Sequence, residues 1–150
     1  MSKKCTVVLI EDEPAILRAI KNIILNHTYP FEVIGTSYNG RDGLELIKET
    51  KPDLVITDIR MPFLDGLTMI KNVKPLCSST AFIILSGYEE FEYAKEAIDL
   101  GVSNYILKPI NKEQVDKILS QVYNNFEKST KQKQFDYLNY FIKDMNLKNK

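Results

Sequence analysis

Short apolar runs alternate along the chain with segments whose apolar residues recur at helical spacing. We expect strands near residues 6–10, 32–37, 54–58, 81–85 and 103–107. We expect helices near residues 14–25, 41–49, 67–73, 89–100 and 112–126. Short β-branched runs between helices are typical of buried parallel strands, and strict alternation implies right-handed crossovers with helices on both sheet faces. The pattern therefore predicts an α/β fold.

Local signals support several of these boundaries. Pro14 stands at the opening of the first helix, where its missing N–H costs little. Gly101 follows the fourth helix as a natural C-terminal stop. Helical spacing predicts that Phe91, Ala94 and Ile98 lie on the inner side of that fourth helix.

The last 24 residues differ from the rest of the chain in charge and in pattern. Residues 1–126 carry 14 basic and 17 acidic side chains, whereas residues 127–150 carry 6 basic and 3 acidic ones. Phe135, Leu138, Ile142 and Met145 recur at steps of three, four and three, which begins a heptad stripe shorter than two heptads. Three interpretations stay open for this segment: an amphipathic extension of the fifth helix, a dimer contact, or a linker to a further domain.

Composition narrows the function classes. The formal net charge is zero, so the whole chain shows no bias toward nucleic acid or membrane surfaces. No uncharged run approaches the ~20 apolar residues of a membrane span, and we expect a cytoplasmic protein without a membrane partner. Cys5 and Cys77 lack metal-ligand spacing, so we expect both to be reduced thiols.

Charged residues follow three of the predicted strands. Glu11 and Asp12 follow the first, Asp58 ends the third, and Lys108 follows the fifth. Ligands of such sheets bind beyond the carboxyl ends of the strands, so these groups should converge. Carboxylate oxygens suit Mg²⁺, and an ammonium group suits a phosphoryl oxygen, so the pattern predicts a phosphoryl-transfer site. Solvated loop acids are the alternative for any one of them.

Three strings carry a resemblance to a known family. They are V-L-I-E-D-E-P at residues 8–14, T-D-I-R-M-P-F-L-D-G at residues 57–66 and Y-I-L-K-P at residues 105–109. In this order and at these separations they resemble the receiver domain of two-component response regulators. The resemblance implies a flavodoxin-like doubly wound sheet of five parallel strands in the order 2-1-3-4-5. It assigns residues 1–126 to the receiver domain and leaves residues 127–150 as a helical tail or linker.

The resemblance also implies a role for each site residue. Asp58 resembles the phosphoacceptor, which takes its phosphoryl group from the phosphohistidine of a sensor histidine kinase. Mg²⁺ is the implied cofactor, held by Asp12, Asp58, the main-chain carbonyl of Arg60 and, through a water, Glu11. Lys108 resembles the lysine that contacts the phosphoryl group, and its bond to Pro109 is cis in this family.

Two further residues match the switch positions of the family. Ser86 resembles the switch hydroxyl, which moves to bond a phosphoryl oxygen. Tyr105 resembles the switch aromatic, which rotates inward as Ser86 leaves space. From the residues alone, a strand-end turn hydroxyl and a half-buried strand aromatic are the favoured interpretations of Ser86 and Tyr105. One departure concerns Glu11, because the family more often has two aspartates at this pair of positions.

The string Y-E-E-F-E-Y-A at residues 88–94 resembles receivers joined to AraC-type DNA-binding domains. It implies a transcription regulator whose output domain is not in this chain, and a homodimer that forms on phosphorylation. A single-domain phosphorelay intermediate is the alternative. An aspartate-nucleophile phosphatase is disfavoured, because Arg60 occupies the position at which those enzymes carry their general acid.

Overall fold

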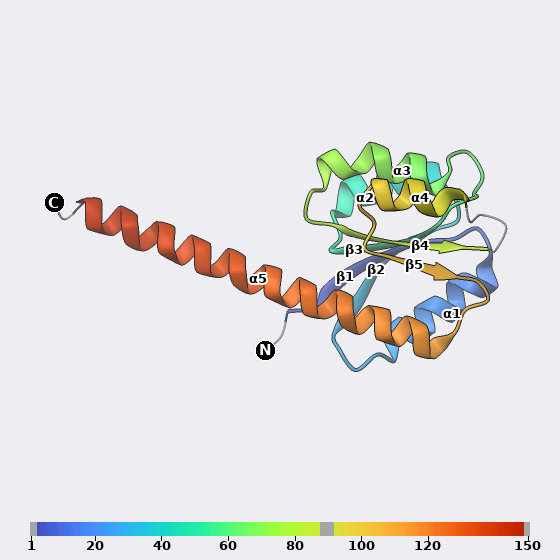
Figure 1. Cartoon of the computed structure of the whole chain (residues 1–150), viewed down its shortest axis with the longest axis horizontal. Helices are drawn as coiled ribbons and strands as arrows, with labels where there is room; N and C mark the ends of the chain where they lie inside the picture. The colour runs from blue at the N-terminus through green and yellow to red at the C-terminus, as the bar shows by residue number, and fades with distance from the viewer. Residues whose placement is uncertain (1–2, 88–91, 149–150) are drawn as a thin grey trace.

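A computed structural model describes residues 3–87 and 92–148. Its elements are β1 (Cys5–Ile10), α1 (Pro14–Leu25), β2 (Phe31–Ser37), α2 (Gly40–Thr50), β3 (Leu54–Asp58), α3 (Gly66–Val73), the 3₁₀ turn η1 (Lys74–Leu76), β4 (Ala81–Ser86), α4 (Glu92–Asp99), β5 (Asn104–Leu107) and α5 (Lys112–Lys148). Within these ranges the strands form one parallel sheet in the order β2-β1-β3-β4-β5. Helices α2, α3 and α4 cover one face, and α1 and α5 cover the other (Figure 1). The predicted fold, strand order and C-terminal helical extension are confirmed.

The sheet is buried on both faces, and this explains why its strands read as continuous apolar runs. In β1, Val7 and Leu9 face the core beneath α1 and α5, whereas Val8 and Ile10 face the core beneath α2 and α3. All four side chains are at most 1% exposed. Full burial of such a side chain contributes roughly 1.5–3 kcal/mol, so the central strands hold the two layers together.

Polar caps fix the starts of the helices that follow β2 and β3. The side chain of Asn39 accepts a hydrogen bond from the Asp42 N–H at the start of α2. The side chain of Asp65 accepts one from the Thr68 N–H at 2.8 Å, at the start of α3. Each cap satisfies a backbone donor that the first turn of a helix leaves without an intrahelical partner.

Helix α4 corrects one prediction. Ala97 is fully buried, whereas Ile98 is 72% exposed and therefore does not lie on the inner side. Neighbouring residues lie about 100° apart around a helix, so seating Ala97 against the sheet turns Ile98 outward. Phe91 lies outside the described residues. Gly101 ends the helix with φ of 78°, in the left-handed conformation that glycine adopts without strain, as predicted.

Helix α5 is longer than the 15 residues predicted for it. Its buried residues are Val115, Ile118, Leu119, Val122 and Tyr123. The helix continues without a glycine or proline to Lys148 and projects well past the edge of the sheet (Figure 1). Among the helices of the described ranges, none combines the length and the apolar content needed to cross a bilayer.

Candidate functional site

The three strand ends converge at one edge of the sheet, as the sequence predicts. The Lys108 ammonium nitrogen lies 3.0 Å from Oδ2 of Asp58 and 3.3 Å from Oε1 of Glu11. Glu11 is 1% exposed and Asp58 4% exposed, whereas the Lys108 side chain reaches the surface in part. Lys108 is 50 positions from Asp58 and 97 positions from Glu11 in the sequence, yet the three side chains form one buried ionic cluster.

The backbone around Asp58 fixes its side chain. Oδ1 of Asp58 accepts a hydrogen bond from the Ile59 N–H at 2.7 Å, which leaves Oδ2 facing Lys108. The loop after β3 then closes back, with the Gly66 N–H donating to the Ile59 carbonyl at 2.7 Å. A Cβ at residue 66 would lie 2.0 Å from the carbonyl oxygen of Asp58, so this approach requires glycine. Gly66 therefore helps to place the acid, a role that the sequence analysis missed.

A second group of carboxylates lies at the mouth of the site. Glu11, Asp12 and Glu13 each offer a carboxylate oxygen within 4.8 Å of the others. Burial falls along this run, from buried Glu11 through half-buried Asp12 to exposed Glu13. The sequence analysis missed Glu13, although its place next to the acidic pair was a visible signal. The Glu13 N–H also donates to Oε1 of Glu11 at 3.2 Å, which ties the start of α1 to the buried acid.

The cluster carries more negative charge than its single ammonium group can offset. Burial, together with the charge of Asp58, raises the pKa of Glu11 to about 8 against the opposing effect of Lys108. Burial also raises the pKa of Asp58, although Lys108 acts in the opposite direction. Burial alone would lower the pKa of Lys108, but its bonds to Asp58 and Glu11 outweigh this and raise it. An additional cation would therefore stabilise the ionised site.

The donor set fits a hard divalent cation. Oε2 of Glu11 is buried and accepts no hydrogen bond within the described residues, although the Lys108 ammonium lies 3.3 Å away. A buried carboxylate oxygen without a donor is costly, and a metal ion or its bound water would satisfy it. Mg²⁺ prefers oxygen ligands and is usually held by one or two carboxylates together with waters. Glu11 and Asp12 supply such oxygens here.

The two predicted switch residues lie on the neighbouring strands. Ser86 is fully buried and follows Leu85, which pairs with Asp58 across β3 and β4. Its hydroxyl donates to the Gly87 carbonyl at 3.0 Å, and its own carbonyl accepts from the Lys108 N–H at 2.7 Å. Tyr105 is half-buried in β5 and packs on the side of the sheet that α3 and α4 cover. The bond between Lys108 and Pro109 is cis.

Arg60 lies at the surface after Asp58. Its guanidinium carbon is 5.9 Å from the centre of the Tyr93 ring, which is cation–π distance. A guanidinium group stays protonated in proteins and does not act as a general acid.

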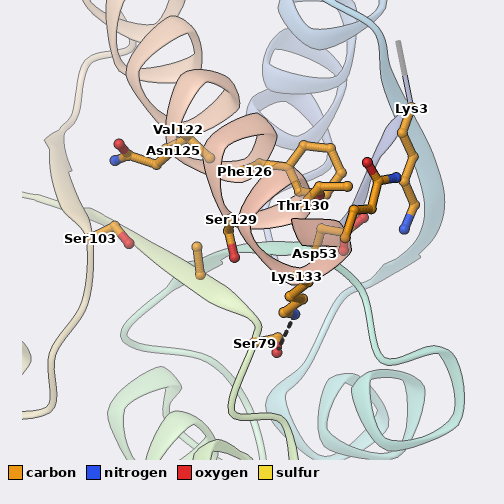
Figure 2. A pocket seen from close by; sticks show the side chains of 12 residues that line it. Lys3, Asp53, Ser79, Ser103, Val122, Asn125, Phe126, Ser129, Thr130 and Lys133 are labelled. Carbon is orange, nitrogen blue, oxygen red and sulfur yellow. Dashed lines mark hydrogen bonds between the residues drawn. The ribbon is translucent and has the colours of Figure 1, made fainter. Parts of the chain in front are cut away.

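A hollow of about 390 Å³ lies at the opposite edge of the sheet, beneath the point where α5 leaves it (Figure 2). Its charged lining groups are Lys3, Asp53 and Lys133. Asp53 is engaged through Oδ2, which accepts hydrogen bonds from the N–H and the hydroxyl of Thr6 at 2.9 Å each. The hollow lies at the amino ends of the strands, whereas Asp58 is the last residue of β3 at their carboxyl ends. The hollow is therefore no part of the acid site.

Comparisons with known proteins agree with this geometry. Residues 7–120 match the response regulator receiver domain. The chain is 42% identical over 116 residues to YesN of Bacillus subtilis, described as an uncharacterized transcriptional regulatory protein, and the match covers 77% of this chain and 32% of that protein. It is 40% identical to the transcriptional regulatory protein HptR of Staphylococcus aureus, over 77% of this chain and 45% of HptR.

A solved structure extends the likeness to three dimensions. The receiver domain of AraT, a response regulator from Geobacillus stearothermophilus, superposes with a TM-score of 0.81 at 31% identity. The superposition covers 85% of this chain and 99% of that one. The chain spans about a third of the length of YesN and under half of the length of HptR.

Proposed function

The chain belongs to the response regulator receiver domain family, and on that premise we propose that it is a phosphorylation-dependent signalling switch. Asp58 accepts a phosphoryl group from the phosphohistidine of a sensor histidine kinase, with Mg²⁺ as cofactor. The observation that carries the proposal is the buried contact of Asp58 with Lys108, beside Glu11, at the carboxyl edge of the sheet.

The chemistry follows from what each side chain offers. A carboxylate oxygen of Asp58 attacks phosphorus, and the P–N bond to the donor histidine breaks. The electron pair of that bond stays on the imidazole nitrogen, so the balance needs no oxidant or reductant. The Lys108 ammonium, already 3.0 Å from Asp58, offsets negative charge on the transferred group. Bound Mg²⁺ would reduce the repulsion between the carboxylate and the anionic donor.

The acidic residues hold the metal in this proposal. Asp12, Asp58 and the main-chain carbonyl of Arg60 are its protein ligands, and Glu11 acts through a bound water. Support comes from Oε2 of Glu11, which accepts no hydrogen bond from the part of the chain that the structure describes, and from the clustering of Glu11 with Asp12. Because Asp58 is itself modified, the protein is a phosphoacceptor rather than an enzyme that turns over a substrate. It promotes its own phosphorylation and its own dephosphorylation.

The switch is proposed to act through Ser86 and Tyr105. A phosphoryl group on Asp58 brings new acceptor oxygens beside the end of β4, where the Ser86 hydroxyl can donate to one of them. Tyr105 then turns inward from its half-buried position, which changes the surface of α4 and β5. Such an element has two states, and the charge added at one end biases it toward the second.

The output is proposed to be transcription. YesN and HptR are transcriptional regulatory proteins, and they are longer than this chain. On this proposal the changed face controls dimerisation or an attached DNA-binding domain, and DNA is reached only through that domain. The cytoplasm is the proposed compartment. A single-domain phosphorelay intermediate, passing its phosphoryl group to a histidine phosphotransfer partner, is the alternative.

Mass spectrometry after incubation with acetyl phosphate and Mg²⁺ tests the proposal directly. Wild type should gain one phosphoryl group, and Asp58→Ala should gain none. Glu45→Gln changes an exposed acid on α2 that is no part of the acid site, and it serves as a control that should label like wild type. Equal labelling of wild type and Asp58→Ala would reject Asp58 as the acceptor.

A further inference from the structure

Helix α5 presents two apolar faces that point in different directions. The first packs on the sheet and consists of Val115, Ile118, Leu119, Val122 and Tyr123. The second, the tail stripe, consists of Phe135, Leu138, Ile142 and Met145. If the tail stripe continued toward the start of α5, its heptad positions would fall on Gln121, Asn124, Lys128 and Lys131. All four residues are exposed and polar. The tail stripe is therefore not a continuation of the face that packs on the sheet.

The tail stripe begins where the helix loses the support of the sheet. Lys133 donates a hydrogen bond to the Ser79 hydroxyl at 3.0 Å across the hollow at the sheet edge (Figure 2). Gln134 still lines that hollow. Beyond it, the four residues of the tail stripe are 44–59% exposed, and Phe141 beside them is 50% exposed. Apolar side chains gathered in this way on a soluble surface mark an interaction site.

We propose that the tail stripe binds the tail stripe of a second copy of this chain, and that the contact forms whether or not Asp58 is phosphorylated. The heptad steps of three, four and three are those of helices that pack against one another along a seam. This contact differs from the phosphorylation-dependent change proposed for α4 and β5, and it does not rest on it.

The area available is enough for a weak dimer. A half-exposed apolar side chain of this size offers on the order of 100 Å². Five such side chains on each of two chains would bury about 1,000 Å², near the lower limit for a specific interface. The body of the protein already forms the first turns of α5, so the tail avoids the cost of helix nucleation that an isolated short coiled coil would meet.

The residues that border the tail stripe favour a second copy of the same chain as the partner. From residue 134 to residue 146 its flanking positions hold Gln134, Asn139, Phe141 and Asn146, all uncharged. Flanks with charges of one sign would repel an identical chain, and complementary charges would select a different one. Uncharged flanks do neither, so a second copy meets no electrostatic barrier there.

Sedimentation velocity of the whole 150-residue chain tests this inference. From roughly 1 to 200 µM, without phosphodonor, the average mass of wild type should rise from 17.3 kDa toward twice that value. Leu138→Glu should raise the dissociation constant at least about tenfold, because it places a charge in the seam. Tyr140→Glu is the matched control, since Tyr140 is 72% exposed and two residues, about 200° of turn, from Leu138.

Each outcome decides the matter. A wild type that stays at 17.3 kDa throughout, or a dimer that survives Leu138→Glu, overturns the inference. Equal dissociation by Leu138→Glu and Tyr140→Glu also overturns it. Asp58→Ala should dimerise like wild type, and a dimer that requires acetyl phosphate and intact Asp58 would place the contact elsewhere. Thermal unfolding should be unchanged in Leu138→Glu at low concentration, which shows that its receiver fold is intact.

Discussion

The acid site and the tail of α5 depart in opposite ways from the rule that folded proteins usually bury apolar side chains and expose charged ones. At the acid site, Glu11 and Asp58 are charged groups that the fold buries. On the tail, Phe135 and Ile142 are apolar groups that the fold leaves in water. Each arrangement costs free energy in the isolated chain, because burial penalises unbalanced charge and water penalises apolar surface.

On the proposals above, each region is completed by a partner. The acid site would gain stability from a cation or a phosphoryl group, and the tail would gain it from another apolar surface. The two differ in how firmly they are held. Ion pairs and close backbone contacts fix the acid site in place, whereas the side chains of residues 131–143 are all exposed. Substitutions should therefore be costly at the first region and nearly neutral for folding at the second.

Lys108→Ala should have the largest effect. It removes the ammonium group beside two buried carboxylates, and breaking a buried pair costs about 3 kcal/mol in the free energy of unfolding. Urea denaturation measures this change. Lys112→Ala is the matched control, because the pair of Lys112 with Asp116 is exposed and such pairs contribute about 0–1 kcal/mol. Equal losses in the two variants would contradict the proposed difference between the regions.

Gly66→Ala should be next. The added methyl group would lie 2.0 Å from the Asp58 carbonyl oxygen, so the loop after β3 must shift. Overpacking of this kind costs roughly 1–3 kcal/mol, and labelling of Asp58 by acetyl phosphate should slow as well. Gly87→Ala is the control, because a Cβ there meets nothing within 4 Å. A Gly66→Ala protein with wild-type stability would show that the loop is less constrained than its contacts indicate.

Glu11→Gln should act in the opposite direction. It puts a neutral amide in place of a buried acid whose ionisation is disfavoured by burial and by Asp58, so without metal it should raise the free energy of unfolding by about 1 kcal/mol. Added Mg²⁺ should raise the melting temperature of wild type but raise that of Glu11→Gln less, because a ligand stabilises only in proportion to its occupancy. Calorimetry with and without Mg²⁺ measures both effects. Identical responses to Mg²⁺ would exclude Glu11 from the metal site.

Ile142→Gln should have the smallest effect on folding. Ile142 is 44% exposed and no described element of the body covers it, so unfolding at low concentration should change by less than about 0.5 kcal/mol. Urea denaturation at 1–2 µM protein (about the lower limit of the range above) measures this. A larger loss would mean that the tail packs on its own receiver domain, and the contrast between the two regions would fail.

Most of the fold was predictable because its signals are local. The bounds of α1 and β3 agree with prediction, since Pro14 and the apolar run at residues 54–58 leave few alternatives. The exposure of Ile98 was not predictable, because a short helix can be turned by one residue without changing its apolar spacing. The length of α5 was left open, since the helix continues outside the core and its apolar stripe there is shorter than two heptads.

The meeting of the charged groups was predictable, but the contacts that support them were not. Glu11, Asp58 and Lys108 were identified because charged groups at the ends of parallel strands must meet. Gly66 was not, because its role depends on a backbone approach that only three-dimensional contacts reveal. That Oε2 of Glu11 accepts no hydrogen bond within the described residues likewise depends on the direction of hydrogen bonds, which a sequence does not specify.

Because α5 is one continuous helix, a small tilt at its base moves its far end by a larger distance. From Phe126 to Lys148 the helix extends about 33 Å at 1.5 Å per residue. A tilt of 10° at its base would carry the far end through about 6 Å, by the same helix geometry. Slight rearrangements among the side chains packed beneath the near end would thus become displacements wide enough to reposition anything fastened beyond residue 148.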